Sequence, residues 1–221
     1  MATNPNFQQG VVGAQHAVPQ LARTSTHSLL SSIQTLKSKV SQSDALRKFT
    51  AAGPASILRN LRLGPLQRIA EVYVPFHLYR VNYTLGREHQ SRLFAIDAVQ
   101  GSLDLFEFPS IPNKSELVQI ETKNALPVKL SDATVETLLR EKVLRIVFQQ
   151  GFFKLRDANL TIERLPLDLH LSYWLAFHGK ESAAIGARVA TSTVRCRVLD
   201  STRNRIEGAK ATALFESWLS A

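Results

Sequence analysis

Strict alternation of apolar and polar residues marks two stretches of this chain. Apolar residues occupy every second position from Val72 to Leu78, and again from Leu167 to Phe177. Successive side chains of a β-strand point to opposite faces, so each stretch predicts a strand with one apolar face. We therefore place one long strand in each half of the chain.

The segments after the two long strands also resemble one another. A shorter strand-like run follows each, Leu93–Ile96 in the first half and Val189–Asp200 in the second. A return strand is predicted after each of these, over Leu103–Phe108 and from Ile206 onward. Short Ala-rich runs do not distinguish strand from helix, so Ala209–Trp218 stays open between the two.

An aspartate ends the shorter strand in each half. Four residues after Asp97 comes Gly101, and four residues after Asp200 comes Asn204. Both aspartates resemble general-acid candidates. An aspartate before a β-turn more often accepts hydrogen bonds from the turn backbone, so we assign both a structural role.

Helical spacing is clearest over Ala133–Gln150, where apolar residues recur every three or four positions. Ser131 or Asp132 can cap this helix. A shorter helix is predicted over Ala45–Ala52, with Asp44 as its N-cap. Both halves of the chain therefore combine a helix with strands.

The residues from Ala95 to Leu103 resemble the hairpin signature of PepSY-type domains. In that signature a strand ends in Val-Asp-Ala and a turn with Thr-Gly follows; Gln100 stands here in place of the Thr. Of this motif the second half of the chain keeps only Asp200. The resemblance implies a helix packed on a small antiparallel sheet, and a binding or inhibitory domain without catalytic groups.

These patterns together predict an α+β protein. Two related helix-plus-antiparallel-sheet units would span residues 44–110 and 115–221, and they could pack as one body. The alternative is that hairpins of one sheet share local patterns by chance, because alternation is common in any antiparallel sheet. Aligning Asp97 with Asp200 sets the apolar Phe94 and Ile96 against Arg197 and Leu199, which counts against a duplication.

Residues 1–43 differ in composition from the rest of the chain. They contain no Asp or Glu and are rich in Ser and Thr, so a flexible segment is expected. A short amphipathic helix is predicted within residues 28–40. Its apolar positions are Leu29, Ile33, Leu36 and Val40.

The net charge of +9 is spread evenly along the chain. Nucleic-acid modules usually concentrate Lys and Arg on one element, so this distribution fits an ordinary basic surface at least as well. Cys196 is the only cysteine, which excludes an intramolecular disulfide and suits a reducing compartment. No apolar run is long enough to span a membrane and no secretory signal is recognisable. We expect a cytoplasmic protein, with organellar import as the alternative.

One face of the two long strands carries large polar-aromatic side chains. We call it the aromatic strand face; its residues are Tyr73, His77, Tyr79, His170, Trp174 and His178. Aromatic residues are frequent interface anchors, so this face is a candidate contact surface for a protein partner or a second copy of the chain. The alternative is a second core layer within the chain.

A second candidate is the densest group of basic residues, here called the arginine cluster. It consists of Arg195, Arg197, Arg203 and Arg205. Guanidinium groups bind phosphates and carboxylates, so the cluster could contact a nucleic acid. A solvated strand edge protected by charge is the other interpretation.

The sequence favours a non-enzymatic protein-binding or assembly module that uses the aromatic strand face and the N-terminal segment. A small enzyme is the first alternative, with His77 and Asp97, or His170 and Asp168, lining a pocket. A nucleic-acid binder is the second. Phosphate-loop, nucleotide-binding and metal-ligand motifs are absent from the sequence, so no cofactor, metal or catalytic residue is assigned.

Overall fold

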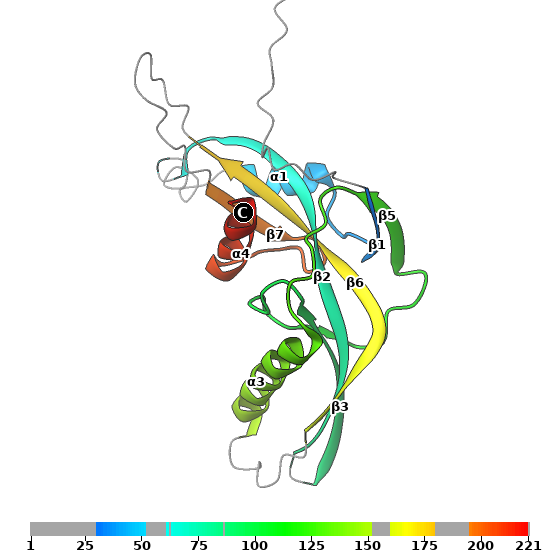
Figure 1. Cartoon of the computed structure of the whole chain (residues 1–221). Helices are drawn as coiled ribbons and strands as arrows, with labels where there is room; N and C mark the ends of the chain where they lie inside the picture. Colours follow the sequence, from blue (N-terminus) through cyan, green and yellow to red (C-terminus); the bar gives the residue numbers. More distant parts are fainter. Residues whose placement is uncertain are drawn as a thin grey trace, which may run out of the picture.

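The computed structural model describes residues 30–51, 61, 63–85, 87–151, 160–179 and 195–220. Eight strands in these ranges form one mixed sheet that curls strongly into a half-barrel (Figure 1). Two strands run side by side along most of the length of the molecule, and helices lie against the sheet. None of the described helices is long and apolar enough to cross a membrane.

The order of strands across the sheet is β4-β3-β2-β6-β1-β5, and β7 pairs with β6 and with β8. The strands are β1 (Ser31–Leu36), β2 (Leu66–Leu85), β3 (Glu88–Asp97), β4 (Phe106–Phe108), β5 (Leu117–Thr122), β6 (Thr161–His178), β7 (Arg195–Asp200) and β8 (Arg205–Ile206). The described helices are α1 (Gln42–Thr50), α3 (Asp132–Gly151) and α4 (Ala209–Leu219).

The two long strands predicted from alternation are β2 and β6, and they pair with each other. Their antiparallel register runs from Leu66 opposite His178 to Asn82 opposite Thr161. The prediction of two related helix-plus-antiparallel-sheet units is therefore wrong. The two strands that were each expected to belong to a separate unit are neighbours at the centre of a single sheet. Alternation shows that a strand has one apolar face, but it does not show which strand lies beside it.

One face of the central pair is buried in the largest core of the molecule. This face carries Val72, Val74, Phe76 and Leu78 of β2, and Leu169, Leu171, Tyr173 and Leu175 of β6. Helix α4 covers it with Ala211, Leu214 and Phe215, and the Tyr173 and Phe215 rings lie 5.6 Å apart. The open choice between strand and helix for Ala209–Trp218 is thus resolved as a helix, because that helix closes this core.

Helices α1 and α3 cover the two ends of the opposite face. Helix α3 packs Val135, Leu139, Val143 and Val147 on Tyr79, Val81 and Tyr83 of β2 and on Phe94 and Ile96 of β3. Helix α1 packs Ala45 and Phe49 on Trp174, Ala176 and Leu199. Helix α3 begins one residue before the predicted start, and the Ser131 hydroxyl accepts from the backbone N–H of Thr134 as an N-cap. For α1 the cap is Ser41, three residues before the predicted Asp44.

The amphipathic helix predicted within residues 28–40 is wrong, because Ser31–Leu36 form strand β1. This strand pairs antiparallel with β5 and parallel with β6, where Thr35 lies opposite His170. The apolar spacing fits a helix, but insertion between two strands satisfies the backbone hydrogen bonds of the segment in another way. Tertiary pairing outweighs a weak local preference here. Strand β5 was not predicted.

Both aspartates that precede turns bind the turn backbone, as predicted. Asp97 accepts from the backbone N–H groups of Gln100, Gly101 and Leu103 at 2.8–2.9 Å. Asp200 accepts from those of Thr202 and Arg203 at 2.8 and 2.9 Å. Gly101 and Asn204 adopt the positive φ values that these turns require, 63° and 56°. The first turn delays the return strand, so β4 spans only Phe106–Phe108 of the predicted Leu103–Phe108.

Candidate functional site

All six residues of the aromatic strand face point to the same side of the central strand pair, by parity and register. Tyr73 lies opposite Ser172, Pro75 opposite His170, and His77 opposite Asp168. This is the face that α1 and α3 cover at its two ends. The chain's own helices therefore bury much of the surface that the sequence offered to a partner.

Four of the six residues are buried. Trp174 lies under α1 and donates its indole N–H to the backbone carbonyl of Val40 at 3.3 Å. His178 places Nδ1 3.1 Å from the backbone carbonyl of Gly64. Tyr79 lies under α3, where burial raises its pKa to about 12. These side chains form part of the core, as in the alternative interpretation of this face.

His77 is the fourth buried residue, and it lies beside charged groups at the start of α3. Its Nδ1 is 3.4 Å from Oδ1 of Asp132, and Arg164 forms ion pairs with both Asp132 and Asp168. Burial and the nearby Arg164 guanidinium lower the pKa of His77, despite the two carboxylates. The expected pair with Asp97 does not form, because Asp97 points to the opposite face and binds its own turn.

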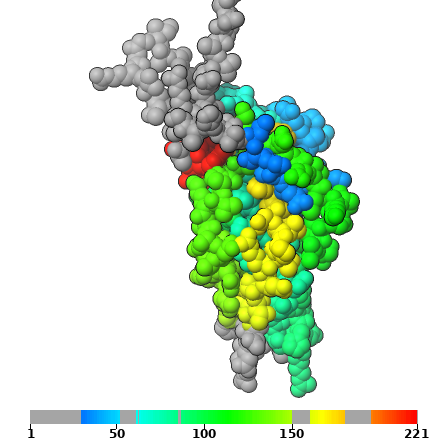
Figure 2. All heavy atoms as spheres, turned by 45° about the vertical axis from the view of Figure 1, so that its right-hand side comes forward, coloured from blue at the N-terminus to red at the C-terminus, as the bar shows by residue number. Residues whose placement is uncertain are grey.

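Tyr73 and His170 are the two partly exposed members of the face. They lie in the middle of the central pair, Tyr73 opposite Ser172 and His170 opposite Pro75. Figure 2 shows β6 at the surface between α3 and the pair β1–β5. Burial lowers the pKa of His170, although Asp168 lies on the same face of β6 and opposes this shift. The Ser172 hydroxyl nearby donates to Glu71 Oε1 at 2.5 Å. It also lies 3.0 Å from the Ser201 hydroxyl, and no histidine is among its hydrogen-bond partners in the described ranges.

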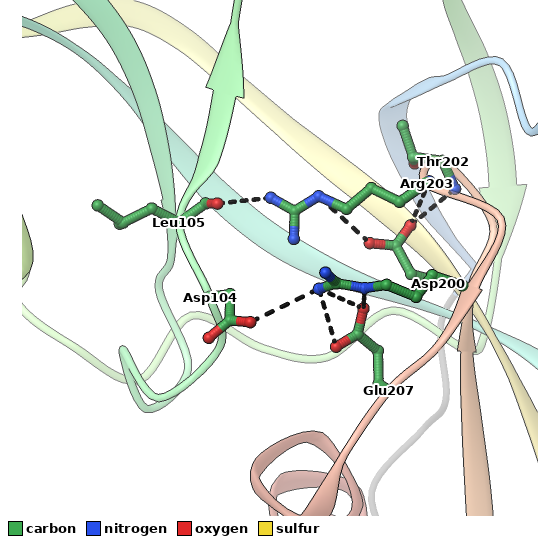
Figure 3. Close-up of polar contacts among 7 residues, drawn as sticks. Asp104, Leu105, Asp200, Thr202, Arg203 and Glu207 are labelled. Carbon is green, nitrogen blue, oxygen red and sulfur yellow. Dashed lines mark hydrogen bonds and ion pairs between the residues drawn. The ribbon is translucent and has the colours of Figure 1, made fainter. Parts of the chain in front are cut away.

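The arginine cluster is divided by the structure. Arg203 donates to the backbone carbonyl of Leu105 at 2.5 Å and lies 3.9 Å from the Asp200 carboxylate (Figure 3). Its guanidinium also stacks 4.4 Å from the ring centroid of Phe106. Arg203 therefore attaches the loop before β4 to the turn after β7.

The other three arginines do not converge on one site. Arg205 pairs with Glu207 at 3.0 Å and with Asp104 at 3.5 Å. Arg197 lies 5.5 Å from the ring centroid of Phe49 in α1, and Arg195 is exposed at the start of β7. Carboxylates of the same chain thus balance the charge of Arg203 and Arg205, which weakens the case for a phosphate site here.

A groove of about 390 Å³ opens where four segments meet. They are residues 36–39 at the end of β1, residues 106, 108–110 and 112 from β4 onward, residues 115–116 before β5, and Thr202 in the turn after β7. Its floor is apolar. Phe108 and Pro112 are buried there and Leu36 and Phe106 half-buried, with the two phenylalanine ring centroids 4.6 Å apart. Lys37 and Lys39 are exposed at its rim. We call this feature the cationic groove.

Backbone hydrogen bonds fix the walls of the cationic groove. The N–H of Lys37 donates to the carbonyl of Glu116 at 2.9 Å, and the N–H of Lys39 donates to the carbonyl of Ser201 at 3.2 Å. On the other side, Pro109 and Pro112 lack the N–H needed to extend β4. The wall of residues 37–39 is therefore fixed by backbone hydrogen bonds. The wall that contains Pro109 and Pro112 cannot pair with it as a strand, so the groove between them stays open.

Sequence reasoning did not find this groove. Its lysines come from the segment predicted to be a helix, and its prolines lie where the first predicted unit, 44–110, ends and the second, 115–221, has not begun. No local motif marks the site, because its segments come together only through contacts between parts of the chain that are distant in sequence, such as the pairing of β1 with β5. The aromatic strand face and the arginine cluster gave stronger signals in the sequence. Most of their residues instead pack in the core or bind to turns.

Three observations on the described residues bear on metal binding and catalysis. No three or more His, Cys, Asp and Glu side chains in these ranges are arranged to hold a metal ion. Three cavities lined by described residues include the cationic groove, and none of the three combines a histidine with a carboxylate. Cys196 is buried, and burial raises the pKa of its thiol to about 12, which fits a structural residue.

Comparisons of the chain with protein-family models, curated proteins and solved structures give no match.

Proposed function

We propose that this protein is a non-enzymatic protein-binding module, and that a segment of its partner occupies the cationic groove. The observation that carries the proposal is the combination of an apolar floor with a charged and hydroxyl-bearing rim in one concave site. Specific binding sites commonly join an apolar base to a few polar groups that fix orientation. The volume of about 390 Å³ lies within the usual range of ~300–1,000 Å³ for ligand sites.

The lining of the groove favours binding over the alternative of a small enzyme. General acid–base catalysis needs a group that exchanges a proton near neutral pH and reaches the substrate. Among the described residues that line the groove, Glu116 is the one carboxylate, and its Oε2 accepts the backbone N–H of Asn113 at 2.9 Å. The buried pair of His77 and Asp132 lies at the start of α3 and does not line the groove.

The proposal keeps the N-terminal segment as a second contact and reduces the role of the aromatic strand face. Only Tyr73 and His170 of that face are partly exposed, so they are the members available to a partner. Strand β1 begins at Ser31, and any truncation that tests the segment must stop before it. Removing residues 1–28 tests the segment, whereas removing residues 1–43 would also delete a strand of the sheet.

Site-specific photocrosslinking tests the proposed function. A photoreactive phenylalanine analogue replaces Ser110, an exposed residue of the groove, and in a control protein replaces Ser91, an exposed residue of β3. We expect irradiation in an extract of the source cells to give a discrete protein adduct from position 110 and not from position 91. The adduct should disappear when Ser38→Trp fills the groove. Identical adducts from both positions, or none from position 110, would refute binding at this site.

A further inference from the structure

The described lining of the cationic groove carries two lysines, Lys37 and Lys39, and one carboxylate, Glu116, so its net charge is positive. The ion pairs formed by described residues involve other cations, and neither the Lys37 nor the Lys39 ammonium takes part in one. Both side chains are exposed and lie two residues apart on one wall. The positive potential at the rim is therefore available to an incoming anionic group.

The chain itself is a poor source of that anionic group. Residues 1–43 contain no Asp or Glu, so the N-terminal segment cannot neutralise the two lysines. A second copy of the chain carries the same net charge of +9, which opposes association through a basic surface. These charges favour a different molecule as the source of the complementary charge.

The floor of the groove sets a second requirement on the occupant. Phe106 and Phe108 lie on the same side of β4, and Arg203 stacks on the Phe106 ring. Together with Leu36 and Pro112, these rings make the floor mainly aromatic and aliphatic carbon. An occupant gains most by burying apolar side chains here while keeping its charge at the rim.

Resting on the binding function proposed above, we infer that the cationic groove recognises an acidic, apolar peptide segment of a partner protein. In an extended segment, successive side chains point in opposite directions. Apolar side chains then enter the groove toward Phe108, and neighbouring Asp or Glu side chains meet Lys37 and Lys39 at the rim. Each ion pair is exposed, so the lysines select the sequence more than they add affinity.

Selection from a random-peptide display library tests this specificity. The library is panned against the wild-type protein, a Lys37→Glu/Lys39→Glu variant, and a control Lys123→Glu/Lys129→Glu variant. The control changes the net charge equally at two exposed lysines outside the groove. Circular dichroism and thermal melting confirm that all three proteins are folded.

We expect peptides enriched in Asp, Glu and large apolar residues from the wild type and the control, and peptides enriched in Lys or Arg from the groove variant. Replacing one acidic residue of a selected peptide by its amide should weaken wild-type binding about two- to fivefold, the range of an exposed ion pair. Enrichment that ignores acidic residues, or the same peptides from all three proteins, would overturn the inference.

A blocking substitution separates the two proposals. Ser110→Trp should abolish binding of the selected peptides, and Ser91→Trp should not. If peptides depend on an open groove but are not acidic, the groove binds protein segments and the inferred specificity is wrong. If no selected peptide is sensitive to Ser110→Trp, both the specificity and the proposed function fail.

Discussion

Substitution of the two buried turn aspartates directly tests how the turns after β3 and β7 are stabilised. Asp97 uses both carboxylate oxygens: Oδ1 accepts from Gln100 and Gly101, and Oδ2 accepts from Leu103. Asp200 uses only Oδ1 for backbone donors, while its Oδ2 makes no hydrogen bond and lies 3.9 Å from the Arg203 guanidinium. The same substitution, Asp→Asn, should therefore have unequal effects at the two sites.

At position 97 the amide group replaces an acceptor by a donor that faces the Leu103 N–H. One hydrogen bond to a charged acceptor is lost, which costs about 1.5–3 kcal/mol, and a buried N–H is left without a partner, which costs about 1–3 kcal/mol. Allowing for overlap between these effects, we expect Asp97→Asn to lower the free energy of unfolding by about 2–4 kcal/mol. Loss of the negative charge also removes favourable electrostatics for Lys142, which donates to the backbone carbonyl of Leu103.

At position 200 the asparagine oxygen can still accept both backbone N–H groups, and its amide takes the place of the oxygen that has no hydrogen bond. Burial also raises the pKa of the Asp200 carboxyl, so its charge is less favourable than that of an exposed aspartate. We expect Asp200→Asn to cost about 1 kcal/mol, mainly the weak interaction with Arg203. The stability of the two variants should thus differ by roughly 1–3 kcal/mol.

Urea denaturation followed by far-UV circular dichroism measures both changes, with Asp168→Asn as a control at an exposed aspartate. The assignment of turn roles would be refuted if Asp200→Asn were as destabilising as Asp97→Asn, or if Asp97→Asn unfolded at the urea concentration of the wild type.

Three further predictions concern the glycine turn, the buried histidines and the thiol. Gly101→Ala should lower stability by about 1–3 kcal/mol in the same urea assay, because φ is positive and the new Cβ would overlap Leu138; an unchanged midpoint would contradict this geometry. The pKa values of His77 and His170 are lowered in the folded state, so below about pH 6.5 the unfolded chain binds more protons and stability should fall. His77→Gln should reduce that fall between pH 7.5 and pH 5, and an identical pH profile would argue against it. Cys196, with a thiol pKa of about 12, should react with a chromogenic disulfide reagent at pH 8 only after denaturation; rapid reaction of the native protein would disprove its burial.

Local residue patterns predicted helices, strands and turns correctly where a pattern is compatible with only one kind of element. Alternation located β2 and β6, the apolar stripe located α3, and the spacing from Asp97 to Gly101 identified a turn held by its own aspartate. In each case the deciding interactions lie within a few residues or follow directly from the period of the element.

The arrangement of these elements depends on partners distant in sequence. The pairing of Val72 with Tyr173 joins two strands whose patterns would fit separate sheets equally well. Residues 31–36 fit a helical spacing, but Ile33 and Thr35 also fit the two-residue period of a strand. Pairing with the neighbouring strands β5 and β6 selects the strand. The cationic groove depends on the same pairing, so neither the fold class nor the site could be derived locally.

The central pair has a consequence for synthesis of the chain on the ribosome. Strand β2 can form a hairpin with β3 as soon as both emerge, but β6 follows roughly a hundred residues later, and closing so long a loop is entropically costly. Until then one edge of a twenty-residue strand has no partner, and such an edge invites pairing with other chains. The nascent protein is therefore most exposed to aggregation just before its last quarter is made, which is when a chaperone would protect it most.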